Sequence, residues 1–113
     1  MIDLDRIKNI YIYPGTTDFR NGIYGLRKLI GPEIETQCLY VFANKAFSSI
    51  KIIETEENAI WLYQKRLTRG RFQYPKSGDK SLLTKGEIEV ILEGISLINR
   101  IESKGRLSTG NFY

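Results

Sequence analysis

The sequence predicts an α+β domain, in which a small, mostly antiparallel sheet of about four strands is combined with one helix after the first strand and one or two C-terminal helices. Three patterns in the 113 residues support this prediction. Within residues 8–13, isoleucines and tyrosines alternate with the two-residue period of a strand. Residues 38–43 are continuously apolar, as expected of a central strand covered on both faces. From Ile88 to Ile95, apolar residues recur at helical spacing.

A helix is expected after the first strand, which ends at Pro14-Gly15. Thr17 or Asp18 can cap the N-terminus of this helix, and Gly31-Pro32 ends it. Its expected apolar side consists of Ile23, Leu26, Leu29 and Ile30. This segment is therefore the helix that the prediction places between the first two strands.

The remaining elements follow from the same kind of pattern. Two further strands are expected at residues 49–53 and 59–67, and with the apolar strand before them they predict an antiparallel meander. Thr84 and Glu87 have the spacing of a capping box, which marks the start of the C-terminal helix. Helical spacing continues through residues 97–101, which accounts for the second C-terminal helix.

The length of the chain suits one folded unit with a single core. We expect residues 1–105 to form this domain and residues 106–113 to be a flexible tail. No stretch approaches the ~18 apolar residues of a membrane span, and the N-terminus lacks the basic and apolar regions of a signal peptide. We therefore expect a cytoplasmic protein without a membrane partner.

The composition argues against most enzymatic functions. The sequence contains no histidine and a single cysteine, Cys38. The absence of histidine excludes imidazole-based acid–base and nucleophilic catalysis and the metal sites that need imidazole. Cys38 opens an apolar run, so we expect a buried and inert thiol. We expect no enzyme, no metal and no cofactor; the minority alternative is a Mg²⁺-dependent nuclease built on Glu54, Glu56 and Glu57.

A basic segment at residues 63–76 is the strongest signal for a binding function. It holds five cations and no acid, interleaved with aromatic residues, in a chain of net charge +4. Because phosphates attract ammonium and guanidinium groups and aromatic rings stack on exposed bases, this composition suits a nucleic-acid contact. With one arginine from the start of the first helix, the candidate nucleic-acid-binding residues are Arg20, Lys65, Arg66, Arg69, Arg71 and Lys76. The alternative is a solvated strand end whose aromatic residues belong to the core, and strand alternation divides the charges between two faces.

Aromatic residues offer a second surface, which suits a protein partner. The candidate partner-binding residues are Trp61, Tyr63, Phe72 and Tyr74. Trp61 and Tyr63 alternate along their strand as Tyr11 and Tyr13 do along the first one, so the four rings can share one aromatic face of the sheet. Packing of these rings against a helix is the more common outcome.

Four short motifs follow one another between about Ile10 and Ile95. They are DFRNGIYGL at residues 18–26, VFANK at residues 41–45, WLYQKRL with GRFQYP at residues 61–75, and LEGI at residues 92–95. In this order and with these gaps, the chain resembles the small TnpB-type accessory protein, the second open reading frame product, of the insertion sequence sixty-six family of bacterial transposable elements. The sequence departs from the family pattern at Asn21, where a basic residue is usual, and at Tyr74, where many relatives have tryptophan.

The resemblance implies an accessory role in transposition, beside a separate DDE-type transposase of the same element. Lys65, Arg66 and Arg71 fall within the family pattern, which strengthens the nucleic-acid hypothesis. We therefore expect a DNA-binding accessory protein whose partners are the DNA of the element ends and the transposase, and we also expect a homo-oligomer. The alternative is an interaction module that docks onto the transposase without contacting DNA. The resemblance carries over no catalytic residue.

Overall fold

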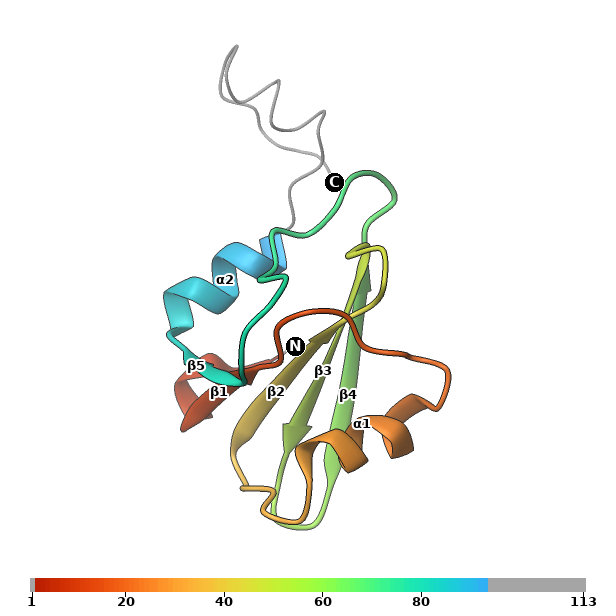
Figure 1. Cartoon of the computed structure of the whole chain (residues 1–113). Helices are drawn as coiled ribbons and strands as arrows, with labels where there is room; N and C mark the ends of the chain where they lie inside the picture. The colour runs from red at the N-terminus through yellow and green to blue at the C-terminus, as the bar shows by residue number, and fades with distance from the viewer. Residues whose placement is uncertain (1, 94–113) are drawn as a thin grey trace.

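The computed structural model of the protein describes residues 2–93, which contain five β-strands and two α-helices (Figure 1). The elements are the 3-10 turn η1 (Leu4–Arg6), β1 (Asn9–Ile12), α1 (Gly22–Ile30), β2 (Cys38–Ala43), β3 (Ser49–Thr55), β4 (Ile60–Arg66), β5 (Ser81–Leu83) and α2 (Lys85–Glu93). This is an α+β arrangement, as the sequence predicts.

All five strands belong to one sheet, in the order β4-β3-β2-β1-β5. β1 and β2 are parallel because α1 connects them by a crossover, and the other three strand pairs are antiparallel. The mostly antiparallel sheet and the β2-β3-β4 meander are therefore confirmed. The fifth strand was not predicted, because the three residues of β5 are too few to show a recognisable period. They form a strand through their pairing with β1.

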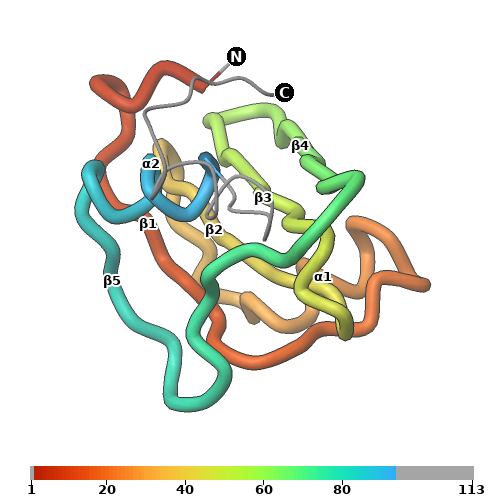
Figure 2. Tube along the Cα trace, turned by 90° about the horizontal axis from the view of Figure 1, so that it is seen from above, coloured from red at the N-terminus to blue at the C-terminus, as the bar shows by residue number. Residues whose placement is uncertain are grey.

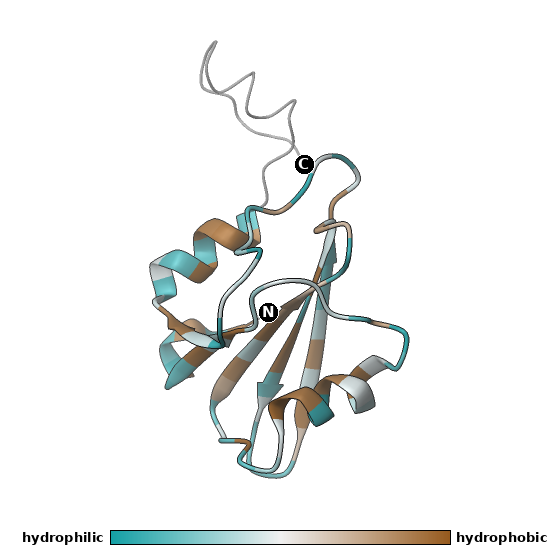
Figure 3. Cartoon of the chain, in the orientation of Figure 1, coloured by the Kyte–Doolittle hydropathy of each residue, from teal (hydrophilic) through white to brown (hydrophobic). Residues whose placement is uncertain are grey.

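The sheet separates two apolar clusters, one on each face. The face toward α2, called here the α2 face, includes Ile12, Leu39, Val41 and Ile52 packed with Ile88 of α2. The face toward α1, called the α1 face, consists of the buried residues Leu26, Cys38, Tyr40, Phe42 and Ile53. In Figure 2, β2 runs between the two helices, and Figure 3 shows the apolar residues concentrated along the central strands. Cys38 is fully buried, as expected.

The start of α1 differs from the prediction. The helix begins at Gly22 with Asn21 as its N-cap, and neither Thr17 nor Asp18 caps it. The Asp18 carboxylate instead accepts hydrogen bonds from the backbone and the guanidinium of Arg20. Since these bonds already satisfy the carboxylate, it is not available as a cap.

The apolar side of α1 is narrower than the sequence predicts. Ile23, Leu26 and Ile30 pack on the sheet, whereas Leu29 is 54% exposed. The helix ends at Gly31, as predicted, because the positive φ of +87° at this residue favours glycine. Three of the four residues expected on the apolar side of the helix therefore contact the sheet.

The predicted capping box begins α2. The Thr84 hydroxyl accepts a hydrogen bond of 3.1 Å from the backbone N–H of Glu87, and the Glu87 carboxylate accepts one of 2.8 Å from that of Thr84. Ile88 and Ile91 are the buried residues of this helix. The expected helix at residues 97–101 and the tail at residues 106–113 lie outside the described residues. Neither α-helix in residues 2–93 is long and apolar enough to cross a membrane.

Candidate nucleic-acid interface

Three connecting segments meet at the end of the sheet where β1, β2 and β4 finish. They are residues 13–21 after β1, residues 44–48 between β2 and β3, and residues 67–80 after β4. Backbone hydrogen bonds hold them together: Leu67 N–H donates to Ser48 O at 2.8 Å, Phe72 N–H to Phe47 O at 2.7 Å, and Gly15 N–H to Pro75 O at 2.8 Å. Figure 1 shows the connection after β4 extending beyond the end of this strand.

Eight cations belong to these segments and to the last two residues of β4, and all except Lys80, whose ammonium lies 4.9 Å from the centroid of the Tyr11 ring, form one set. We call this set the basic end; it consists of Arg20, Lys45, Lys65, Arg66, Arg69, Arg71 and Lys76. All seven are exposed residues. Within residues 13–21, 44–48 and 65–80, the only acids are Asp18 and Asp79. The fold thus brings all six candidate nucleic-acid-binding residues to one end of the sheet and adds Lys45.

Two aromatic side chains anchor the connection after β4. Phe72 and Tyr74 are only 4% and 6% exposed, and both belong to the core of the α2 face. The Tyr74 hydroxyl donates to the backbone oxygens of Tyr13, at 2.8 Å, and Val41, at 2.9 Å. Burial raises the pKa of Tyr74, so the hydroxyl remains a proton donor. Because Phe72 and Tyr74 are anchored in the core, the side chain of Arg71, which precedes them, is left in solvent.

The burial of Phe72 and Tyr74 changes the candidate list for partner binding. Both were expected to contact a partner, but their rings are covered by the protein itself. They therefore act as core anchors in this structure, as the alternative interpretation of the basic segment holds. Trp61 and Tyr63 are the two candidates that retain exposed surface, since Trp61 is 53% exposed and Tyr63 half-buried.

Lys65 and Arg66 lie on opposite faces of the sheet, as strand alternation predicts. Lys65 pairs with Ile50, which belongs to the core of the α2 face, and its ammonium donates to the backbone oxygen of Leu92. Arg66 pairs with Ser49 and lies on the α1 face. The basic end is therefore wrapped around the end of the sheet and is not confined to one face.

Arg20 differs from the other cations because a carboxylate compensates its charge. Its guanidinium lies 2.6 Å from the Asp18 carboxylate in an exposed ion pair. Hydrogen bonds from Arg20 lower the pKa of Asp18 to about 2, and the charge of Lys45 acts in the same direction. Because Asn21 adds no charge, this corner of the basic end contributes little net attraction for phosphate.

Lys45 is the cation that the sequence analysis missed. It lies in the β2–β3 turn, where the Asn44 side chain accepts hydrogen bonds from the N–H groups of Ser48 (2.9 Å) and Ser49 (3.0 Å). These bonds fix the shape of the turn, and the bonds from Leu67 N–H to Ser48 O and from Phe72 N–H to Phe47 O hold it against the connection after β4. Lys45 therefore joins residues that follow it by twenty or more positions. Its position two residues after the buried strand β2 places it at this end of the sheet, but the sequence does not show that the connection after β4 lies beside it.

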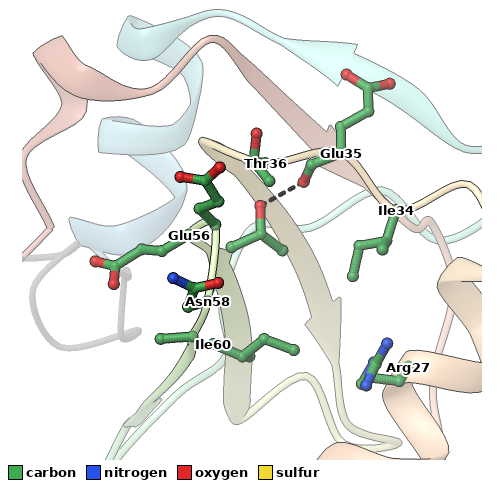
Figure 4. Close-up of a pocket in the computed structure, with 10 residues that line it drawn as sticks. Arg27, Ile34, Glu35, Thr36, Glu56, Asn58 and Ile60 are labelled. Carbon is green, nitrogen blue, oxygen red and sulfur yellow. Dashed lines mark hydrogen bonds between the residues drawn. The ribbon is translucent and has the colours of Figure 1, made fainter.

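The opposite end of the sheet is rich in acids. Glu35, Glu56 and Glu57 lie there, beside a hollow of about 500 Å³ between α1 and the β3–β4 turn (Figure 4). The Glu35 carboxylate accepts a hydrogen bond of 2.8 Å from the Tyr11 hydroxyl, which helps to lower the pKa of Glu35. Arg27 is the one cation among the residues that line the hollow. Charge is therefore unevenly distributed along the strand direction: the basic end holds seven cations, and the hollow at the other end is lined by three carboxylates and one guanidinium.

Two of the three acids proposed for a nuclease have structural partners instead. Glu54 accepts a hydrogen bond of 2.7 Å from the Tyr63 hydroxyl, and Glu56 accepts one of 3.0 Å from the indole N–H of Trp61. Burial and the neighbouring Glu54 raise the pKa of Tyr63 to about 12. Within residues 2–93, no three histidine, cysteine, aspartate or glutamate residues form a group that could hold a metal ion. We assign no catalytic role to these carboxylates.

The four alternating aromatic residues do not share a face. Tyr11 and Tyr13 lie on the α1 face, where they stack on Tyr40 and Phe42 with ring centroids 5.2 Å and 4.5 Å apart. Trp61 and Tyr63 are stacked on each other at 6.3 Å on the opposite face, since Tyr63 pairs with Ile52 of the α2 face. The four rings therefore do not form the single aromatic face that the alternation permits, because the register across the sheet places the two pairs on opposite sides. Tyr11 and Tyr13 instead pack in the cluster on the α1 face, which is the outcome given as more common.

Comparison with known proteins agrees with the motifs. A family model described as IS66 Orf2 like protein matches residues 8–102. A protein of Sinorhizobium fredii, named "Uncharacterized protein y4hO", is 29% identical over 91 residues, which are 76% of this chain and 79% of that protein. No solved structure matches the chain.

Proposed function

Because the chain belongs to the IS66 Orf2-like family of accessory proteins associated with the transposition of insertion sequences, we propose that it binds the DNA of the element ends through its basic end. The observation that carries this proposal is the clustering of seven exposed cations on segments that contain only two acids. One of these acids, Asp18, is already paired with Arg20. The other six cations form no ion pair within the described residues, so their charges can neutralise phosphates and release the counterions of the DNA.

The preferred nucleic acid is a duplex. Proteins that bind single strands without sequence preference stack exposed aromatic rings on the bases. In the basic segment the rings of Phe72 and Tyr74 are buried, and the third ring, that of Tyr63, is half-buried and stacked on Trp61, which leaves little ring surface for stacking on bases. Arg69 and Arg71 instead lie in a connection beyond the sheet, where guanidinium groups can contact phosphates from both strands of a duplex.

The test is a titration of the protein into a labelled duplex from the terminal repeat of the element. Fluorescence anisotropy measures binding at several salt concentrations. We expect the logarithm of the binding constant to fall linearly with the logarithm of the salt concentration, with a slope that reports the number of phosphates neutralised. In the double variant Arg69→Glu/Arg71→Glu we expect this number to be smaller by about two. The matched control is Arg27→Glu/Lys28→Glu in α1, which changes net charge equally but lies away from the basic end. Equal binding by both double variants contradicts the proposal, and a scrambled duplex reports any sequence preference.

Docking onto the transposase is the second candidate function. The exposed indole of Trp61 favours a protein contact, because large exposed aromatic rings are enriched in interfaces. This function predicts that the protein copurifies with the DDE-type transposase of the same element in high salt and has little affinity for naked duplex. Loss of copurification at every salt concentration contradicts it.

A further inference from the structure

β4 is a long edge strand with one open side. Its seven residues pair with β3 along their whole length, and within the described part of the chain no strand pairs with its outer side. The other edge of the sheet, β5, has only three residues. Natural proteins usually shorten, bulge or cover such edges, since their free N–H and C=O groups are available to another strand.

The exposed side chains of β4 indicate what kind of element covers it. Trp61 on the α2 face is 53% exposed, and Leu62 on the α1 face is 39% exposed. A helix or loop packed on one face of the sheet would cover one of these residues and leave the other in solvent. A strand added to the edge extends both faces at once and brings neighbours to both residues.

The charges at the two ends of β4 indicate which strand can pair with its open edge and in which direction. Glu56 and Glu57 precede the strand, and Lys65 and Arg66 end it. An antiparallel copy of β4 sets the basic end of each strand beside the acidic end of the other, whereas a parallel copy sets like charges together. We propose that β4 pairs antiparallel with β4 of a second copy, which joins two five-stranded sheets into one of ten strands.

The register of this pairing follows from the alternation of side chains. Directly opposed residues share a face, so the two-fold axis must pass through a residue and not between two residues. Centring it on Tyr63 pairs all seven residues of both strands. Trp61 then lies opposite Lys65 of the second copy on the α2 face, where the apolar stem of the lysine can pack on the indole ring. Leu62 lies opposite Gln64 of the second copy on the α1 face.

The test measures the association of the full-length chain by sedimentation velocity over a range of concentrations. We expect a dimer, and we expect Trp61→Lys to weaken it by about tenfold or more because each new lysine faces Lys65 of the other copy. Val90→Lys is the matched control, since Val90 is a similarly exposed apolar residue on α2. The double variant Trp61→Lys/Lys65→Glu restores opposite charges in this register and is expected to recover the dimer.

A cross-linking experiment tests the register directly and does not depend on the charge variants. We expect Tyr63→Cys to be linked to itself between two copies by a short bismaleimide, because position 63 lies on the two-fold axis. Leu82→Cys on β5, at the opposite edge of the sheet, is the control that stays unlinked. A monomeric chain, a dimer insensitive to Trp61→Lys, or preferential linking at position 82 overturns the proposal. Linking of position 63 to the transposase alone also overturns it, in favour of a heterotypic contact.

Discussion

Individual side chains in the basic segment have different roles: the buried ones stabilise the fold, and we propose that the exposed ones bind DNA. Tyr74 and Arg71 are three residues apart, yet one is buried against the sheet and the other lies in solvent. The Tyr74 hydroxyl contacts the ends of both β1 and β2 through the backbone oxygens of Tyr13 and Val41. It therefore ties the connection after β4 to the residue that follows β1 and to β2, without contributing charge to the basic end.

Replacement of this hydroxyl is expected to lower stability without changing affinity for DNA. Tyr74→Phe leaves two backbone oxygens without their donor, which costs about 1–2 kcal/mol in the free energy of unfolding. Urea denaturation measures this difference, and Tyr24→Phe, at an exposed tyrosine of α1, is expected to change it by less than about 0.5 kcal/mol. Equal stability of the two variants would show that the hydroxyl does not stabilise the segment, and reduced duplex affinity of folded Tyr74→Phe would give it a direct binding role.

At the scale of elements, periodicity predicts most of the fold. β1 to β4 and α2 follow from alternation, an apolar run and a capping box, because each pattern records burial on one or two faces. β5 does not follow, since pairing with β1 and not its own sequence defines it. The start of α1 at Gly22 depends on the bond between Asp18 and Arg20, which competes with capping.

The candidate site was predicted less completely than the fold. Its basic residues are visible in the sequence because they are close together along the chain. The burial of Phe72 and Tyr74 is not visible, since alternation alone does not show that the connection folds back onto the sheet. Lys45 joins the basic end through hydrogen bonds between segments distant in sequence, which no local pattern records.

The capping box of α2 permits a test at this scale. Thr84→Ala removes the hydroxyl that accepts from Glu87 N–H, and such a loss costs about 1 kcal/mol of stability. Ser77→Ala, at an exposed position in the connection before β5, is the control. Both variants are compared by urea denaturation monitored by circular dichroism. Equal midpoints would show that α2 contributes too little to global stability for its cap to matter.

The whole molecule has a charge asymmetry that follows from its topology. The connections after β1, β2 and β4 meet at one end of the sheet and, with the last two residues of β4, carry the seven cations of the basic end. The β3–β4 turn and the segment before β2 carry Glu35, Glu56 and Glu57 at the other end. This uneven distribution of charge supports both proposals. The cations attract DNA to one end of the sheet, and the opposite charges at the two ends of β4 favour antiparallel pairing of this edge strand with a second copy.

If both proposals hold, each dimer is expected to bind two duplexes. Antiparallel pairing points the two basic ends in opposite directions along the strands, so one duplex bound to each end does not obstruct the other. Two terminal-repeat duplexes with different fluorophores are therefore expected to sediment together with the protein. Trp61→Lys should still bind a single duplex, since its basic end is intact, but should lose this bridging. Bridging that survives in a monomeric Trp61→Lys protein would show that one chain holds two duplexes, and dimers that hold only one duplex would place the DNA across both basic ends or on another surface.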